Sequence, residues 1–465
     1  MTPSSFPLRS GLVFLLLVVI AFVLHLPVLD LSFFSDDFSV IHRIGVKGDL
    51  GTGSFFRPLP DWTIYLNYLV TGPTPIAFRV INVALLGFNA WLVLLLGRNL
   101  FGDDTARYSA MTAALLFVCY PFHNEPQLWI IGRSTAMATS FTLLALITAT
   151  GTANDIKRYT LVGIFGALGA LCYELALLLP LLLIPLTLIA SSKERRVRSA
   201  MVVITSAVAG SNLLLRSLFT GHVANTYGAS FFDEGFSSYL GRSVKVMARL
   251  FLPPNPDPTN QVLSFAMLVV VLLGIILFLV RRTKKDRLNR SMLLVLTSLV
   301  IVACGIGIIG GVSTRTSESD RFLYLPSAFV CLLAARVITI LLRARWRSVA
   351  AALFLVACVI AMRVNHKHWV VASRTIEAIV ERTPTPPTNG RLLVWNLPGD
   401  HKGAFIFRHG YREALEFAGK DASRVRVSPE GPNALGECLI TETGDTLHRK
   451  DNDRWFDVGI VAPTP

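Results

Sequence analysis

The chain carries little charge for its length. Only 16% of its 465 residues are Asp, Glu, Lys or Arg, whereas a soluble protein normally carries about 25%. Its six cysteines are scattered singly with no C-x-x-C spacing, which argues against a zinc knuckle or a redox pair. No glycine-rich nucleotide-binding fingerprint is present either. Long apolar runs take the place of the missing charge and predict a membrane protein.

The formal net charge of +14 is distributed unevenly along the chain, in a way that indicates membrane topology. Residues 364–465 hold 13 Lys/Arg and 13 Asp/Glu, so the whole excess precedes them. One alternate set of loops carries 18 Lys/Arg in 56 residues, and the other carries 10 in 118. Because Lys and Arg concentrate on the cytoplasmic side, we expect the N-terminus inside and the C-terminal residues outside. A nucleic-acid partner is not expected.

The apolar runs predict an all-α polytopic bundle of about eleven membrane-spanning helices within residues 1–363. The predicted spans are 11–29, 76–96, 108–121, 130–150, 159–173, 175–190, 199–216, 261–280, 291–311, 322–342 and 348–363. A small α/β domain outside the membrane is expected over 364–465, with a linker at 383–390. Its predicted elements are strands at 391–398, 424–428, 437–443 and 454–461 and a helix at 407–419.

The first outer loop, residues 30–75, begins with two adjacent carboxylates, Asp36 and Asp37. Desolvation beside the lipid and a neighbouring like charge both raise a carboxyl pKa, which suits a general base. Alternatively, these residues cap a helix from about Phe38 to Ile44, and one aspartate can cap while the other points into a cleft. Further along, Arg57 precedes a proline. Aromatic residues typical of an interfacial helix follow at Trp62, Tyr65 and Tyr68.

Two charged clusters stand at the outer ends of later spans. Glu125 and Arg133 either pair to hold two spans together or belong to a site. Glu174 lies between two apolar runs and needs a partner across the bundle, for which Arg133 or Arg216 would serve.

The outer loop 217–260 contains an amphipathic stretch from Ser237 to Leu252. Its basic residues are Arg242, Lys245 and Arg249, spaced to share a helical face. This face either binds a lipid phosphate or is solvated.

Arg321 and Tyr324 lie three residues apart at the outer end of the tenth span, on one helical face. The planar fork of Arg matches phosphate oxygens. Asp320 offers the alternative of a local ion pair with Arg321.

Five segments of the chain follow one known pattern in order and spacing. They are SDDF (35–38), FRPLPDWTIYLNYL (56–69), FHNEPQLWIIGRS (122–134), CYELALLLP (172–180) and SDRFLYLPSAF (319–329). They resemble the membrane half of GT-C class glycosyltransferases that use polyprenyl- or dolichyl-phosphate sugars. The likeness is greatest to the transmembrane O-mannosyltransferases that carry tetratricopeptide repeats, and it covers about residues 11–345. The chain departs from them after the last span, where no 34-residue repeat is found.

The resemblance implies an inverting glycosyltransferase that moves a hexose or pentose from a polyprenyl-phosphate carrier to a protein, lipid or glycan hydroxyl. The reaction is expected on the non-cytoplasmic face of a membrane, here the bacterial inner membrane. The resemblance implies no particular cofactor, and a requirement for a divalent cation is left open.

The resemblance also implies residue roles. An acidic residue of the first outer loop is the base. Asp37 is favoured over Asp36, which is better placed as a cap. Arg321 and Tyr324 match an Arg-Tyr motif that contacts the donor phosphate, assisted by Arg133 or Arg216. The remaining polar residues expected in the acceptor and sugar cleft are His123, Glu125, Glu174 and Arg57.

Two other functional classes compete with this interpretation. A transporter or lipid flippase often shows repeated halves and charges near the bilayer midplane. The sequence has no such repeat, and Arg336 is its only clearly intramembrane charge. A non-catalytic assembly subunit would keep the same fold and tolerate loss of both Asp36 and Asp37.

Overall fold

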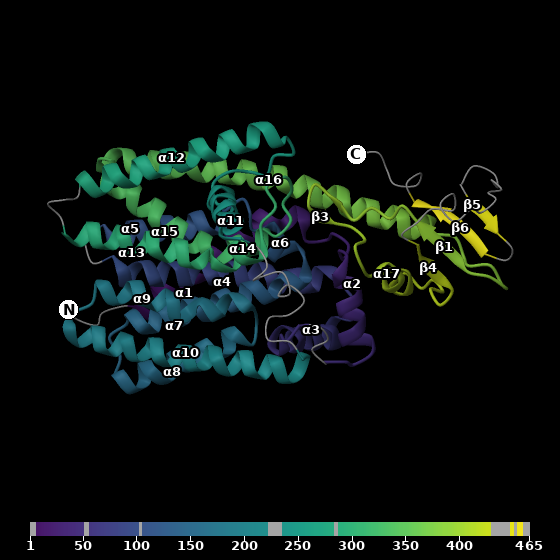
Figure 1. Cartoon of the computed structure of the whole chain (residues 1–465), viewed down its shortest axis with the longest axis horizontal. Helices are drawn as coiled ribbons and strands as arrows, with labels where there is room; N and C mark the ends of the chain where they lie inside the picture. The colour runs from purple at the N-terminus through teal and green to yellow at the C-terminus, as the bar shows by residue number, and fades with distance from the viewer. Residues whose placement is uncertain are drawn as a thin grey trace.

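The computed structural model describes residues 6–50, 55–101, 105–221, 235–282, 287–428, 447–450 and 453–458. Most of these residues are helical. Figure 1 shows a bundle of long helices, with the N-terminus at one end and a smaller part that contains strands beyond the other end.

Each of the eleven predicted spans falls on helical structure. The helices are α1 (Phe6–His25), α4 (Pro75–Leu100), α5 (Ala106–Val118), α7 (Arg133–Thr150), α8 (Asp155–Ala170), α9 (Leu179–Leu188), α10 (Ser192–Thr220), α12 (Pro258–Arg282), α13 (Arg287–Ala303) with α14 (Gly305–Gly310), α15 (Tyr324–Leu341) and α16 (Ala344–Arg382).

Seven of the described helical segments are long and apolar enough to cross a membrane. They are Gly11–Val28, Pro75–Leu100, Ile130–Thr150, Ser192–Thr220, Asn289–Gly310, Asp320–Leu341 and Ala344–Arg382. Shorter apolar helices occupy Ala106–Val118, Glu174–Leu188 and Thr259–Ile275. The chain is therefore an integral membrane protein, while the count of eleven spans and their orientation stay predictions.

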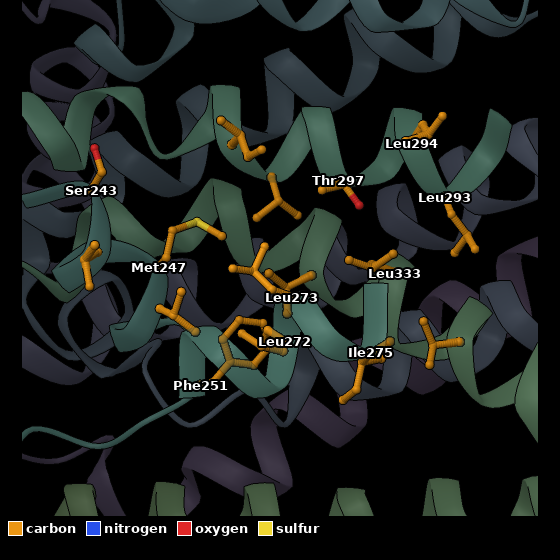
Figure 2. A pocket seen from close by; sticks show the side chains of 17 residues that line it. Ser243, Met247, Phe251, Leu272, Leu273, Ile275, Leu293, Leu294, Thr297 and Leu333 are labelled. Atoms are coloured by element: carbon orange, nitrogen blue, oxygen red, sulfur yellow. The ribbon is translucent and has the colours of Figure 1, made fainter. Parts of the chain in front are cut away.

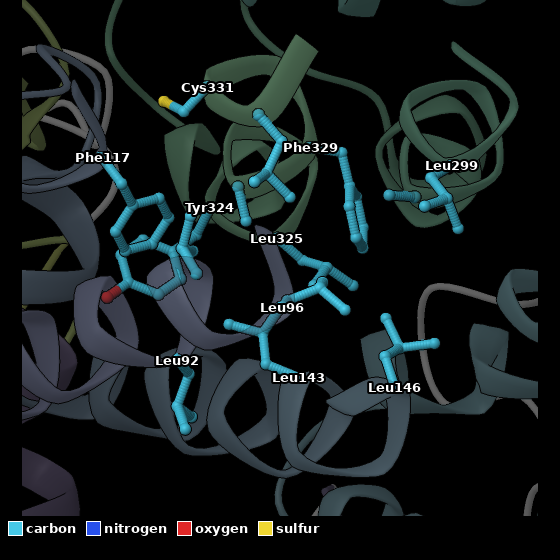
Figure 3. Close-up of a cluster of buried hydrophobic side chains, with 14 of the residues drawn as sticks. Leu92, Leu96, Phe117, Leu143, Leu146, Leu299, Tyr324, Leu325, Phe329 and Cys331 are labelled. Carbon is cyan, nitrogen blue, oxygen red and sulfur yellow. The ribbon is translucent and has the colours of Figure 1, made fainter. Parts of the chain in front are cut away.

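The centre of the bundle is formed by helices that are apolar on nearly all sides, as burial on all sides requires. Helix α4 packs against α1, α5 and α7, and α15 packs against α5 and α13. Figure 3 shows part of this core, where Phe117 of α5 meets Tyr324 of α15. The rings of Phe117 and Tyr324 are 5.3 Å apart in an edge-on arrangement.

Short helices connect the long ones at the end of the bundle that faces the strands (Figure 1). They are α2 (Asp36–Ile41) with a π-helical turn at His42–Val46, α3 (Pro58–Thr71), α6 (Asn124–Leu128) with the 3-10 turn η3 (Ile130–Gly132), the 3-10 turn η4 (Glu174–Leu178), α11 (Phe236–Arg249) and the 3-10 turn η6 (Asp320–Leu323). Most of the acidic residues discussed above lie in these connections.

Helix α16 is longer than its predicted span. It runs for 39 residues, or about 58 Å at 1.5 Å per residue, and it leaves the bundle to reach the strands (Figure 1). The predicted span at 348–363 lies within this helix, which continues to Arg382. Neither proline nor glycine interrupts residues 364–382, so the helix continues until Thr383 and Pro384.

A four-stranded sheet follows, in the order β4-β1-β6-β5. Strand β1 (Leu392–Trp395) lies parallel to both β4 (Val425–Val427) and β6 (Asp453–Asp457), and β5 (Leu447–Lys450) is antiparallel to β6. The strand expected at 437–443 lies outside the described residues. The expected helix is shorter than predicted and forms α17 (Tyr411–Phe417). That this part is a separate domain outside the membrane stays a prediction.

Candidate functional site

Glu125 and Arg321 form the centre of the site. The Glu125 carboxylate accepts a hydrogen bond from the backbone N–H of Arg321 at 2.9 Å and forms an ion pair with its guanidinium. The pair is held by α6 and η6, the short turns that precede α7 and α15. Burial raises the pKa of the Glu125 carboxyl, and the charge of Arg321 opposes this effect. Of the alternatives that the sequence left open, neither a Glu125–Arg133 nor an Asp320–Arg321 ion pair forms among the described residues, because Glu125 pairs with Arg321 and Asp320 with Arg249.

Arg321 is also held by aromatic residues. Its guanidinium carbon lies 5.3 Å from the ring centre of Trp129, and its Nε donates to the Tyr173 hydroxyl at 3.3 Å. The Trp129 indole N–H is buried and has no hydrogen-bond partner in the described part of the chain. Neither aromatic was singled out from sequence, although both lie within the segments that carry the family resemblance.

A second charged cluster adjoins the first through Tyr173. Glu174 forms ion pairs with Arg57 at 2.9 Å and with Arg216 at 2.6 Å. The guanidinium of Arg57 also lies 4.3 Å from the ring centre of Tyr173. Of the two partners expected for Glu174, Arg216 pairs with it and Arg133 does not, and Arg57 is a partner that the sequence did not reveal. Tyr173 thus links the Glu125–Arg321 pair to the Arg57–Glu174–Arg216 cluster.

The two adjacent aspartates have different surroundings. Asp37 is fully buried, and its carboxyl accepts the backbone N–H groups of Phe34, Ile130 and Ile131, each at 3.2 Å. Burial raises the pKa of Asp37 to about 7, against the effect of these hydrogen bonds and of the Arg79 charge.

Asp36 is half-buried, and its carboxyl accepts the Ser35 hydroxyl at 3.5 Å. It is the first residue of α2 rather than its N-cap, which is Ser35, and no side-chain capping bond forms there. The premise that made Asp36 the better cap is therefore wrong. Asp37 instead ties α2 to the segment that holds Trp129.

Arg79, near the start of α4, also holds the segment around Trp129 in place. It is fully buried, and its Nε donates to the Leu128 carbonyl at 3.0 Å. Its other nitrogens donate to the carbonyls of Leu29, Leu31 and Ser32. An arginine so close to an apolar run was the available sequence signal for this anchor.

Three predicted site residues point into the bundle instead of joining the charged clusters. Arg133 donates to Asn82 at 2.9 Å and to Asn67 and the Phe78 carbonyl at 3.0 Å. The Tyr324 hydroxyl accepts a hydrogen bond from Asn89 at 3.2 Å. His123 contacts the Ser327 hydroxyl at 2.7 Å, and burial lowers its pKa well below the usual value.

The basic residues of α11 do not form one solvated face. Arg249 is fully buried, forms an ion pair with Asp320 and donates to the Ser313 carbonyl at 3.1 Å. Arg242 donates to the Ile309 carbonyl at 2.9 Å, and Lys245 is exposed. Arg249 therefore ties α11 to the turn that carries Arg321.

An apolar pocket of about 440 Å³ lies between α11, α12, α13 and α15. Figure 2 shows Met247 of α11 and Phe251, two residues after the end of α11, at one end of the pocket, and Leu272, Leu273 and Ile275 of α12 along it. Among the described lining residues, only Ser243 and Thr297 carry a side-chain oxygen or nitrogen. Among the described residues, no group of three or more His, Cys, Asp or Glu is placed to hold a metal ion.

Comparisons with known proteins find similarity to glycosyltransferases. The family model described as dolichyl-phosphate-mannose-protein mannosyltransferase matches residues 57–214. Protein O-mannosyl-transferase Tmtc1 of Drosophila melanogaster is 31% identical over 147 residues, which make up 28% of this chain and 17% of the fly protein. Protein O-mannosyl-transferase TMTC2 of Mus musculus is 31% identical over 97 residues, or 21% of this chain and 11% of the mouse protein. The chain thus spans less than a fifth of these curated relatives.

Solved structures extend the likeness to the whole chain. ArnT from Cupriavidus metallidurans, bound to undecaprenyl phosphate, superposes with a TM-score of 0.54 over 96% of this chain and 97% of that chain, at 14% identity. The oligosaccharyltransferase AglB from Archaeoglobus fulgidus, in complex with an inhibitory peptide and a dolichol-phosphate, gives 0.50 over 90% of this chain and 64% of that chain, at 13% identity. The resemblance to GT-C class glycosyltransferases is therefore confirmed: the chain has the GT-C fold, and residues 57–214 match a mannosyltransferase family model.

Proposed function

We propose that this protein is a membrane glycosyltransferase that moves a monosaccharide from a polyprenyl-phosphate carrier to a hydroxyl acceptor with inversion at the anomeric carbon. The observation that carries the proposal is the arrangement of Arg321, stacked on Trp129 and held by Glu125 and Tyr173 beside the Arg57–Glu174–Arg216 cluster. The AglB and ArnT structures hold dolichol-phosphate and undecaprenyl phosphate, respectively.

Arg321 is suited to bind the donor phosphate. Its side chain is 13% exposed, so an incoming anion can reach it, and a guanidinium offers paired N–H donors that match phosphate oxygens. The unpartnered Trp129 indole N–H adds a neutral donor at the same place. Negative charge grows on the phosphate as the glycosidic bond breaks, and preorganised donors stabilise this charge most in the transition state.

Asp36 is the better candidate for the general base. The lone pairs of Asp37 are engaged by three backbone N–H groups within a fully buried site, so an acceptor hydroxyl cannot approach it. Asp36 lies on the same turn and retains partial exposure. In the proposed step, Asp36 takes the hydroxyl proton as the acceptor oxygen attacks the anomeric carbon. The carbon–oxygen bond to the phosphate breaks, and the polyprenyl phosphate leaves with the electron pair.

The apolar pocket between α11 and α15 suits the prenyl chain of the donor. Asp320 pairs with Arg249 of α11 and directly precedes Arg321, and residues of α11 also line the pocket. A lipid whose phosphate is held by Arg321 would bury its first prenyl units against Met247 and Phe251. Such burial contributes about 25 cal/mol per Å² of apolar surface.

The distribution of Lys and Arg supports a reaction on the non-cytoplasmic face. The basic loops lie at the end of the bundle where the N-terminus is found, and the short turns of the site lie at the opposite end (Figure 1). A protein hydroxyl is the acceptor class that the mannosyltransferase relatives favour.

The experiment is transfer from a panel of labelled polyprenyl-phosphate sugars to acceptors in proteoliposomes that contain the purified protein. We expect one donor to support transfer, and we expect Arg321→Gln to raise the KM for that donor at least about tenfold, the cost of one charge-assisted hydrogen bond. Arg345→Gln is the matched control, because Arg345 is exposed at the other end of the bundle.

Two results would count against the proposal. Sealed vesicles that accumulate or flip a labelled lipid without any sugar transfer would favour the transporter class. Equal KM values for wild type and Arg321→Gln would remove Arg321 from the donor site.

A further inference from the structure

The segment from Gly399 to Gly410, here called the strap, crosses the site from the C-terminal part of the chain. Its core is a tight hairpin of β2 (Asp400–His401) and β3 (Ala404–Phe405), closed by Lys402 and Gly403. Both turn residues have positive φ, 51° and 93°, which is the combination that a type I′ hairpin turn requires. The turn type thus defines the backbone shape of the hairpin and the positions of its contacts on either side.

The strap binds the turn that precedes Asp36. The backbone N–H of Ser35 donates to the Ile406 carbonyl at 2.9 Å, and the N–H of His409 donates to the Ser35 hydroxyl at 3.3 Å. Gly410 packs so closely that a Cβ atom there would lie 2.5 Å from the Ser35 carbonyl oxygen. The position of α2, and with it that of Asp36, therefore depends on the strap.

The strap also binds the turn that precedes Arg321. The N–H and the hydroxyl of Ser317 donate to the Lys402 carbonyl at 3.3 and 3.2 Å, and Arg408 forms an ion pair with Glu318. A Cβ atom at Gly403 would lie 2.5 Å from the Ser317 backbone nitrogen. Ser317 in turn accepts the Asp320 N–H at 3.3 Å, one residue before Arg321.

A third contact of the strap is with Trp129, the aromatic residue that lies against the Arg321 guanidinium. The ring centres of Phe405 and Trp129 lie 5.0 Å apart, and the Arg321 guanidinium carbon lies 5.3 Å from the same Trp129 ring centre. One short segment therefore contacts all three stretches of chain that bear the proposed base, the aromatic platform and the phosphate-binding arginine.

Backbone strain is concentrated at the same contacts. Ser35 and Ser319 are non-glycine residues with φ of 44° and 71°. Such conformations persist only where the surrounding structure holds them. Each of these serines lies one or two residues before a proposed functional side chain, so release of the strap would let both turns relax.

We propose that the strap is the positioning element of the site, with Gly403 and Gly410 as its positioning residues. It fixes the distance between the turn that presents Asp36 and the turn that presents Arg321. This inference rests on the proposed glycosyltransferase function. Transfer needs the hydroxyl-activating and phosphate-binding groups at one separation, and a misplacement of about 1 Å costs on the order of a hundredfold in rate.

The test compares three alanine substitutions at left-handed glycines. Gly403→Ala and Gly410→Ala place a methyl group against the two turns, whereas Gly419→Ala has the same kind of backbone conformation, with φ of 72°, and no atom within 4 Å of its Cβ. We expect the first two to lower kcat by about ten- to a hundredfold, with donor KM changed less than about threefold, and Gly419→Ala to keep the wild-type kcat within about twofold. Phe405→Leu, which removes the ring contact with Trp129 but stays apolar, should give a smaller loss of kcat.

Hydrogen exchange provides a readout that does not depend on activity. The amides of Ser35 and Ser317, which donate to the strap, should exchange slowly in the wild type and in Gly419→Ala and at least about tenfold faster in Gly403→Ala and Gly410→Ala. Unchanged exchange in both variants would overturn the proposal, and so would faster exchange with an unchanged kcat. A wild-type protein that transfers no sugar, with the same exchange pattern, would instead refute the proposed function.

Discussion

Glu125 and Arg321 are 196 residues apart in the sequence and form an ion pair at the end of the bundle that faces the strands. Glu125 is 1% exposed and Arg321 13%, so the pair is shielded from water on one side and accessible on the other. The carboxylate keeps the guanidinium in place before any donor binds. A preorganised cation of this kind loses little conformational freedom when an anion arrives.

Loss of Glu125 should destabilise the protein as well as the site. In Glu125→Gln, Arg321 keeps its charge without its buried partner, which typically costs about 3–5 kcal/mol. Thermal unfolding in detergent, followed by circular dichroism, should show a clearly lower Tm than in Glu381→Gln, where the residue is exposed. Equal Tm values for these two variants would show that the pair contributes nothing to the fold.

The two aspartates should separate into a catalytic and a structural role. Asp36→Asn should lower kcat by about 10²- to 10⁴-fold, the usual contribution of a general base, with little change in Tm. Asp37→Asn should lower the free energy of unfolding by about 1–3 kcal/mol, because one of the two oxygens that accept three backbone N–H groups becomes a donor. The reverse assignment, a stable but inactive Asp37→Asn beside an active Asp36→Asn, would make Asp37 the base.

Asp37 should also make the free energy of unfolding depend on pH in a defined direction. Its folded-state pKa of about 7 lies above the ordinary value of 3.8, so the folded protein holds this proton more tightly than the unfolded chain. The stabilisation from this group is full below about pH 4 and is lost as the pH rises through 7. The Tm of the wild type minus that of Asp37→Asn should therefore decrease between pH 4 and pH 8. A difference that grows with pH would contradict this sign.

The apolar pocket should recognise the length of the donor lipid. Ala334 lines it, and Ala334→Phe would fill part of the space between α13 and α15. We expect a weaker affinity for a long-chain polyprenyl-phosphate sugar, by about tenfold, and little change for an analogue with one or two prenyl units. Leu353→Phe, at an exposed position of α16, is the matched control. A loss of affinity that is equal for both donors would place the prenyl chain elsewhere.

The helices could be predicted because their signals are local. An apolar run of sufficient length determines a span wherever it occurs, and each predicted span falls on helical structure. The last predicted span ends at 363, where the composition turns polar, while the helical backbone continues to Arg382. Polarity marks where a helix leaves lipid, whereas prolines and caps mark where it ends.

The pairing of charges could not be predicted, because it depends on which helix ends meet in space. Sequence proximity offered Glu125–Arg133 and Asp320–Arg321 as alternatives, but Glu125 pairs with Arg321 and Asp320 with Arg249. Glu174 was expected to find a partner across the bundle, since an unpaired carboxylate is costly there. That argument offered Arg133 or Arg216, and Arg216 is the residue that pairs. Arg57 is 117 residues away in the sequence and carried no signal for this contact.

One measurement tests the proposed function of the site most directly. Sugar transfer from the preferred labelled polyprenyl-phosphate donor should be compared between the wild type and the Asp36→Asn/Asp37→Asn double variant in proteoliposomes with equal amounts of folded protein. We expect transfer in the wild type, with the opposite anomeric configuration in the product, and a rate in the double variant at least about a hundredfold lower. Full transfer by the double variant would contradict an aspartate base at this turn.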